Sequence, residues 1–340
     1  MTDRMIPLSC EALGAWLVKE LETRHAMMGI PSALFFHPNP DDVFRVTIGD
    51  HELDTPIGVA AGPHTQLAQN IVAAWLCGAR VIELKTVQEL DELEVSKPCI
   101  DMQDAGYNVE WSQELRIGQS IDEYVKAWVL IHALHRHLGM GGTRPGVLFN
   151  MSIGYDLKGI RQNKVQTFLR EMANAEEKIR ACRSELERFF PWIWELEIPT
   201  RLSDQVTLST MHGCPPDEIE RIAAYLLSEQ QLDTLVKLNP TLLGVPALEQ
   251  ILQHGLGFDD IQPARATCEK DLSFDQAIPM LKRLAALARE QGRLFGVKLS
   301  NTLAVENRRS VFSASEKEMY LSGRPLHPVT VQLARRLREA

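Results

Sequence analysis

The stretch TPIGVAAGP at positions 55–63, followed by VIELKTV at positions 81–87, decides the fold of this chain. Each stretch contains a short run that is apolar on both faces, as buried parallel strands are. A helical pattern over 65–77 separates the two runs. Strand, helix and strand in this order predict a β–α–β unit of a parallel sheet.

The same alternation extends along most of the chain. Strands are predicted at Ile57–Ala61, Val81–Lys85, Val147–Met151, Val206–Thr210, Leu235–Leu238 and Gly296–Leu299, with a weaker candidate near Asp260–Ala264. Helical patterns cover 65–77, 120–138, 161–189, 216–229, 246–254, 274–291 and 327–338. Polar residues and glycines follow the strand ends, where α/β barrels carry their chemistry. The pattern therefore predicts an α/β fold of the β/α-barrel type.

The domain organisation follows from what surrounds these strands. No linker or repeat interrupts the chain, so we predict one continuous barrel domain over residues 1–340. A helix over 11–28 and a hairpin over 44–54 make residues 1–54 an N-terminal cap of the barrel. The segment 161–204 is longer than a barrel crossover needs, so we expect a helical insertion there.

Composition excludes several classes of function. Lys and Arg number 36 against 45 Asp and Glu, a net charge of −9 that argues against a nucleic acid or an anionic membrane as partner. No signal peptide or membrane-spanning run is present, so we expect a soluble cytoplasmic protein. The six cysteines form no CxxC pair, so we expect neither an iron–sulfur cluster nor another metal within this chain.

Three lysines stand at the carboxyl ends of predicted strands: Lys85, Lys237 and Lys298. Lysines that converge at that end of a barrel would face one small anionic or electron-rich ligand. The first strand ends in Ala60, Ala61 and Gly62, whose small side chains let a planar ligand lie against the backbone.

Several motifs resemble those of the dihydroorotate and dihydropyrimidine dehydrogenases. TPIGVAAGP and ELKTV resemble the first two barrel strands of that family, and GYNVE (106–110) resembles its pyrimidine-reading element. TLST (207–210), VKLNPT (236–241), SNT (300–302) and MYLSGRPLHP (319–328) follow in the family's order. Longer runs such as KPCIDMQDAGYNVEWS (97–112) and LSTMHGCPP (208–216) resemble the N-terminal barrel of a narrower group, the selenate reductase iron–sulfur subunits. That group consists of large bacterial flavoproteins.

The resemblance implies an FMN-dependent TIM barrel that transfers a hydride between the flavin and a planar pyrimidine- or purine-like substrate. The implied cofactor-binding residues are Ala60, Ala61, Gly62, Lys85, Thr86, Asn150 and Lys237. The implied substrate-binding residues are Asn108, Glu110, Ser209, Asn301 and Thr302.

The acid/base residue stays open among three candidates. Thr210 stands where the family has its catalytic cysteine or serine, and an alcohol is a poor base near neutral pH. Cys214 is an alternative, because a thiol near lysines can have a lowered pKa. His212 is a third candidate, and a loop hydrogen bond accounts for it equally well.

In the resembled family, the last two strand–loop units bind the FMN phosphate, and we expect this chain to lack them. By itself it should then hold FMN weakly or not at all. The missing barrel portion and electron-transfer modules carrying FAD, NADPH and 4Fe–4S clusters would lie downstream or on another polypeptide. Two alternatives stay open: a catalytically silent barrel that serves as scaffold of a redox complex, and an aldolase-type barrel that uses a lysine Schiff base.

Overall fold

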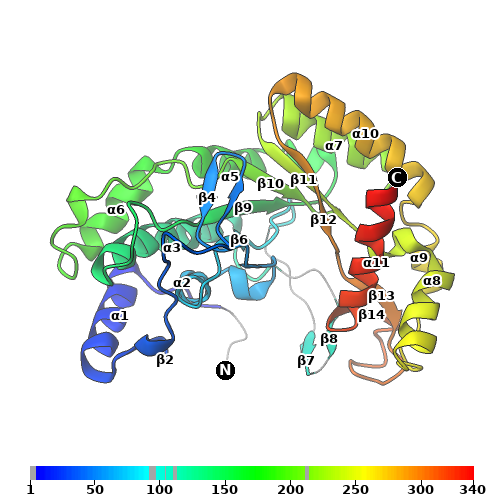
Figure 1. Ribbon diagram of the computed structural model, residues 1–340, viewed down its shortest axis with the longest axis horizontal. Helices are drawn as coiled ribbons and strands as arrows, with labels where there is room; N and C mark the ends of the chain where they lie inside the picture. The colour runs from blue at the N-terminus through cyan, green and yellow to red at the C-terminus, as the bar shows by residue number, and fades with distance from the viewer. Residues whose placement is uncertain (1–4, 92–96, 104, 110–112, 211–213) are drawn as a thin grey trace. The chain divides into compact units, whose positions relative to one another are not determined.

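The computed structural model describes residues 5–91, 97–103, 105–109, 113–210 and 214–340 (Figure 1). Its contacts divide the chain into two compact units. Unit 1 comprises Met1–Glu92, Gln113–Ser152 and Arg161–Val206, and unit 2 comprises Leu93–Ser112, Ile153–Ile160 and Thr207–Ala340. Each unit is assembled from three separate segments of the chain.

A six-stranded sheet in the order β12-β11-β10-β9-β6-β5 is the half-barrel of a TIM-barrel fold. Its strands are β5 (Gly58–Val59), β6 (Val81–Glu83), β9 (Leu148–Ile153), β10 (Gln205–Leu208), β11 (Asp233–Leu238) and β12 (Phe295–Leu299). All six fall on the six main strand candidates, which confirms the predicted fold class. The weaker candidate at 260–264 is wrong: only Pro263 forms an isolated bridge there, to Val305, and proline has no N–H for a ladder.

Unit 1 packs helices and two hairpins around the first strands of the sheet. Its longer helices are α1 (Cys10–Arg24), α2 (Ala68–Leu76), α3 (Ile117–His137), α5 (Asn163–Ala173) and α6 (Glu176–Leu186), and its shorter ones η1 (Ser32–Leu34), η2 (Pro63–Thr65) and η3 (Ile193–Glu195). The hairpins pair β1 (Ala26–Met27) with β2 (Ile30–Pro31) and β3 (Val46–Ile48) with β4 (His51–Leu53). Helix α3 contacts α2, α5 and α6, and Trp75, Tyr124 and Phe168 are fully buried in this core. The β3–β4 hairpin lies within the segment 44–54, and α5, α6 and η3 lie within 161–204.

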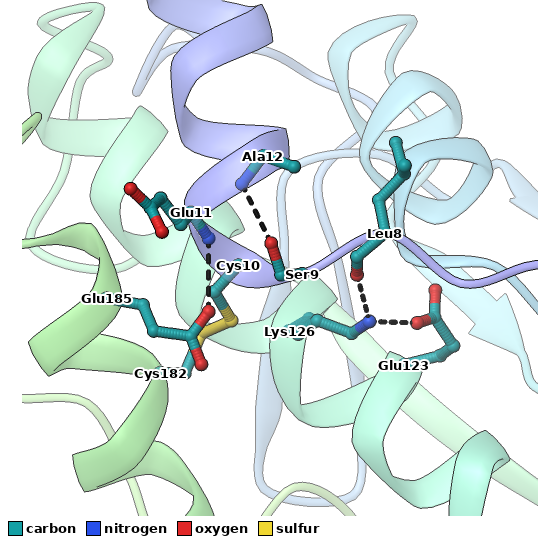
Figure 2. The surroundings of a disulfide bond; sticks show 9 residues. All are labelled: Leu8, Ser9, Cys10, Glu11, Ala12, Glu123, Lys126, Cys182 and Glu185. Carbon is teal, nitrogen blue, oxygen red and sulfur yellow. Dashed lines mark hydrogen bonds and ion pairs between the residues drawn. A yellow bond between two sulfur atoms is a disulfide. The ribbon is translucent and has the colours of Figure 1, made fainter.

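A disulfide joins Cys10 at the start of α1 to Cys182 in α6 (Figure 2). The two Cα atoms lie 5.8 Å apart, within the usual range for a disulfide, and both side chains are buried. Ser9 caps α1 by accepting a hydrogen bond from the Ala12 N–H at 3.1 Å. The sequence did not predict this link, because 172 positions separate the two cysteines.

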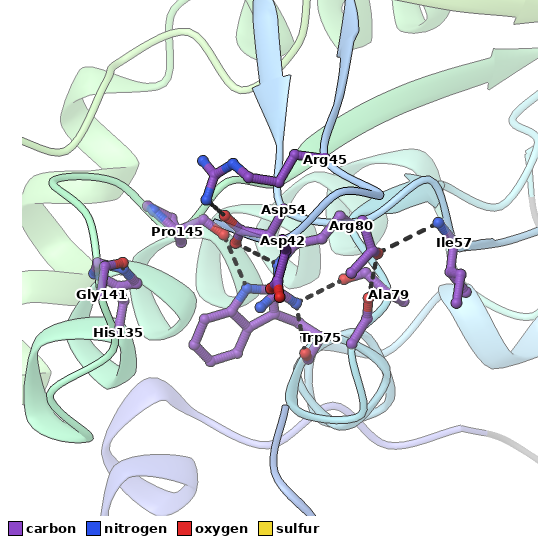
Figure 3. Close-up of polar contacts among 12 residues, drawn as sticks. Asp42, Arg45, Asp54, Ile57, Trp75, Ala79, Arg80, His135, Gly141 and Pro145 are labelled. Carbon is purple, nitrogen blue, oxygen red and sulfur yellow. Dashed lines mark hydrogen bonds and ion pairs between the residues drawn. The ribbon is translucent and has the colours of Figure 1, made fainter. Parts of the chain in front are cut away.

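A buried ion pair between Asp54 and Arg80 links the segments that precede strands β5 and β6 (Figure 3). Arg80, which is 0% exposed, donates from Nε to Asp54 Oδ2 at 2.9 Å. Its Nη1 donates to the carbonyl oxygens of Trp75 at 2.8 Å and Ala79 at 3.1 Å. Gly146 adopts a φ of +53°, and a Cβ there would lie 2.4 Å from Asp54 Oδ2, so only glycine fits beside this carboxylate.

Unit 2 adds an antiparallel sheet that the sequence did not predict. Its order is β13-β14-β8-β7, from β13 (Leu303–Glu306), β14 (Glu318–Gly323), β8 (Ala105–Asn108) and β7 (Ile100–Met102). Its helical segments are α4 (Leu157–Ile160), α7 (Pro216–Ser228), η4 (Pro240–Leu243), α8 (Val245–Glu249), the π-helical η5 (Gln250–Gly255), α9 (Arg265–Cys268), α10 (Phe274–Gln291) and α11 (Leu326–Glu339). These strands are three to six residues long and come from distant segments of the chain. No local alternation of apolar and polar residues therefore predicts the sheet. None of the described helices is long and apolar enough to cross a membrane.

Candidate active site

In unit 1, buried polar side chains gather where the carboxyl end of β6 lies beside the middle of β9. Lys85 is 6% exposed, and Thr86 and Asn150 are also buried. Glu83 and Asn150 are in register, and Leu84 N donates to Asn150 O at 2.9 Å, so the residues that follow β6 run alongside β9. Thr86 Oγ1 lies 2.8 Å from Ser152 Oγ, within hydrogen-bond distance. Three predicted cofactor-binding residues are thus brought together.

The small-residue loop after β5 is held by a buried carboxylate. The Ala61 N–H donates to Glu83 Oε2 at 2.7 Å, and Glu83 is fully buried. Gly62 N donates to Thr65 Oγ1 at 3.2 Å, which starts the short helix η2. Ala60 is exposed, whereas Ala61 and Gly62 are half-buried. The predicted contact surface for a planar ring is therefore a loop whose backbone is anchored to the neighbouring strand.

Glu83 lies in the ELKTV run, and the sequence did not predict its role. The available signal was an acidic residue within an otherwise apolar buried strand, where a carboxylate needs hydrogen-bond donors. The N–H that satisfies it comes from 22 positions earlier in the chain.

In unit 2, Ser209 and Thr210 are buried directly after β10, with Ser209 N donating to Ile153 O at 2.9 Å. Cys214 follows, just before α7. Burial, together with the carboxylates of Glu218, Asp217 and Asp156, raises the pKa of the Cys214 thiol to about 11. The expectation of a lowered pKa is therefore wrong, because burial disfavours the thiolate and the nearby carboxylates raise the pKa further.

Two lysines stand side by side on β11 and β12. Lys237 and Lys298 are in register on these parallel strands, and residues in register project to the same face of a sheet. Both side chains are half-buried. The two predicted strand-end lysines of unit 2 are thus neighbours.

Near the ends of the same strands, four polar side chains are connected by hydrogen bonds. Asn301 Nδ2 donates to Asn239 Oδ1 at 3.1 Å, and Asn239 Nδ2 donates to Asp271 Oδ2 at 3.1 Å. Thr241 Oγ1 donates to the same Asp271 oxygen at 2.8 Å. The sequence indicated Asn301 and missed Asp271, which precedes α10 and looks like an ordinary residue of a helix start.

The remaining predicted residues are placed as follows. Asn108 ends β8, in register with Tyr320 of β14, and is half-buried. Thr302 is half-buried just before β13. Glu110 and His212 lie outside the described residues. Within the described part of the chain, no group of three or more His, Cys, Asp or Glu side chains is placed to hold a metal ion.

The half-barrel and its polar strand ends define a domain of the TIM-barrel class. A ligand-free dihydroorotate dehydrogenase (DHODH) from Eimeria tenella superposes with a TM-score of 0.50 at 16% identity, covering 97% of this chain and 79% of that one. This likeness shows the fold. The family described as "Oxidoreductase YgfK, N-terminal TIM-barrel domain" matches residues 28–340, and the chain belongs to this family.

The curated relatives are two bacterial proteins. "Putative oxidoreductase YgfK" from Escherichia coli strain K12 is 42% identical over 353 residues, covering 98% of this chain and 34% of the relative. The protein of the same name from Escherichia coli O157:H7 gives the same values. The chain spans about a third of the length of these relatives. The narrower likeness to selenate reductase subunits stays a prediction.

Proposed function

We propose that this domain binds FMN and contributes to hydride transfer with a planar pyrimidine- or purine-like heterocycle, in the manner of dihydropyrimidine dehydrogenases. The observation that carries the proposal is the buried group of Lys85, Thr86 and Asn150, in which the carboxyl end of β6 lies beside Asn150 of the parallel strand β9. A buried ammonium is retained where it meets electron-rich partners. This is the end of a barrel where ligands bind.

The residues present fit a flavin ring. A planar ring edge rich in carbonyl and N–H groups can be met by a lysine, a hydroxyl and a carboxamide, and these are the side chains of Lys85, Thr86 and Asn150. The loop at Ala60–Gly62 has little side-chain bulk, and its backbone is fixed by Glu83. FMN, when bound, supplies hydride acceptance and donation at its N5 atom.

Each residue set has a role within this proposal. Lys85 and Thr86 hold the ring edge beside Asn150, and Lys237 stabilises negative charge on the ring. Asn108, Glu110, Ser209, Asn301 and Thr302 offer donors and acceptors to the substrate. This division of roles rests on the resemblance, and the geometry of each unit is compatible with it.

The proton at the substrate carbon is assigned to Thr210 or Cys214. With a pKa of about 11, Cys214 is a neutral thiol near pH 7 and can donate a proton, whereas it is a poor base. Thr210 is buried next to Ser209. Because an alcohol is a poor base near neutral pH, Thr210 would act through a hydrogen bond to the substrate or to water.

The electron-transfer partners belong to the proposal as well. Because the relatives are about three times as long as this chain, they have room for further modules. We infer that FAD, NADPH and 4Fe–4S clusters reside in such modules, on the same polypeptide or a partner, and that the whole forms one redox complex.

The test is a flavin titration of the protein together with its downstream polypeptide. Lys85→Ala should weaken FMN binding at least about tenfold, the effect of losing a charge-assisted hydrogen bond of ~1.4 kcal/mol or more. Lys19→Ala, which removes an exposed lysine of α1, is the matched control and should leave FMN affinity unchanged. Absence of a flavin absorbance band in the whole protein would sink the proposal and favour the scaffold alternative.

A further inference from the structure

In unit 2, the hydrogen bonds that link Asn301, Asn239 and Asp271 all run in the same sense, from Asn301 as donor towards Asp271 as acceptor. A carboxylate only accepts hydrogen bonds, so both neighbours of Asp271 Oδ2 must present donors to it. Thr241 does so through its hydroxyl, and Asn239 through Nδ2. The two ends of a carboxamide differ chemically, and here the carboxylate determines which end of Asn239 faces it.

The orientation of Asn239 in turn determines that of Asn301. With Nδ2 turned to Asp271, Asn239 turns its Oδ1 to Asn301, and that oxygen accepts from Asn301 Nδ2 at 3.1 Å. The backbone of Asn301 is fixed as well, since its N–H donates to Leu238 O at 2.9 Å. One of the two Nδ2 hydrogens of Asn301 is thereby used within the protein, and the orientation of the carboxamide is fixed, so that Oδ1 is the acceptor that Asn301 can present to a ligand.

We propose that Asp271 is a positioning residue that orients Asn239 and Asn301, so that Asn301 offers a hydrogen-bond acceptor and selects a ligand with a ring N–H. This inference rests on the proposed function for the kind of ligand, and it goes beyond it by naming the ring edge. Lys298, in register with the Lys237 assigned to the flavin ring, supplies a cationic donor that suits a carbonyl group. An acceptor accompanied by such a donor fits a cyclic imide, in which the N–H lies beside a carbonyl.

The decisive perturbation is a swap of acid and amide. In Asp271→Asn, position 271 offers both donor and acceptor, so the orientation of Asn239 is no longer enforced. In the double variant Asp271→Asn/Asn239→Asp, the carboxylate moves to position 239, where it still requires the Nδ2 of Asn301. The double variant has the same net charge as the parent protein and should restore the orientation. Asp259→Asn, at an exposed position, is the matched control.

The first readout needs no ligand. In protein labelled with ¹⁵N-asparagine, hydrogen exchange of the Asn301 side-chain amide reports its hydrogen bond to Asn239. Asp271→Asn should speed this exchange at least about tenfold, and the double variant should return it to within about twofold of the parent. An unchanged exchange rate in Asp271→Asn would overturn the proposal that Asp271 orients Asn239 and Asn301.

The second readout is ligand selectivity, measured with uracil and 3-methyluracil on the protein with its downstream polypeptide. The parent should bind uracil about tenfold more tightly than 3-methyluracil, whose imide N–H is blocked; Asp271→Asn should lose most of that ratio, and the double variant should regain it. A ratio that Asp271→Asn leaves intact refutes the selective role of Asp271. If the parent binds neither probe, the pyrimidine-like substrate of the proposed function fails, and the exchange measurement alone decides the orientation.

Discussion

Removing the carboxylate of Asp54 should destabilise the protein strongly, because Arg80 would be left as a buried charge. The guanidinium of Arg80 is wholly inaccessible and already bonds two carbonyl oxygens, at Trp75 and Ala79. The Arg80 Cζ also lies over two aromatic rings, 5.1 Å from the centroid of Phe36 and 5.2 Å from the centroid of Trp75. None of these groups carries the compensating negative charge that Asp54 supplies.

The magnitude follows from the type of pair. Breaking a buried ion pair by deleting one partner costs about 3–5 kcal/mol, so Asp54→Ala should lower the free energy of unfolding by that amount. With an unfolding entropy of ~2.1 cal/mol/K per residue over 340 residues, the melting temperature should fall by about 4–7 °C. Asp54→Asn keeps the shape and one acceptor, and should cost about 1–3 kcal/mol.

Urea denaturation and calorimetry of the two variants measure these losses directly. The matched control is Glu339→Gln, which breaks the exposed pair between Arg335 and Glu339 on the last helix. That change should stay within about 0.5 kcal/mol, as exposed helix pairs do. If Asp54→Ala costs no more than the control, the carbonyl and aromatic contacts suffice for Arg80, and the ion-pair reasoning is wrong.

Two further predictions concern unit 1. Burial lowers the pKa of His132 to about 4 from an ordinary 6.5, so unfolding binds a proton between these values. Stability should therefore decline by about 3 kcal/mol as pH falls from 6.5 to 4, and His132→Gln, compared by denaturation across this window, should lack that part of the decline. Reducing the Cys10–Cys182 disulfide frees a loop of 172 residues and should lower the free energy of unfolding by about 3–5 kcal/mol; an equal denaturation midpoint with and without reductant would contradict a stabilising role.

The predictable part of the site lies at strand ends. Lys85 and Lys237 each follow an apolar run, and the run itself predicts both the strand and the end at which the lysine stands. The neighbourhood of Cys214 was not predictable in this way. Its pKa is raised chiefly by burial, which no local pattern reveals, and then by Glu218 and Asp217 in α7 and by Asp156, 58 positions away.

The parallel strands, the helices between them and the N-terminal hairpin were determined by the sequence, because hydrophobic periodicity is a local property of the chain. The Ala61–Glu83 anchor, the Asp271–Asn239–Asn301 relay, the antiparallel sheet and the Cys10–Cys182 link were decided only by the tertiary structure. Each of these joins residues that are far apart in sequence, and hydrogen bonds and disulfides form wherever folding brings a donor to an acceptor or a thiol to a thiol. The candidate site residues could thus be named from the sequence, whereas the direction in which their polar groups point is set by distant partners.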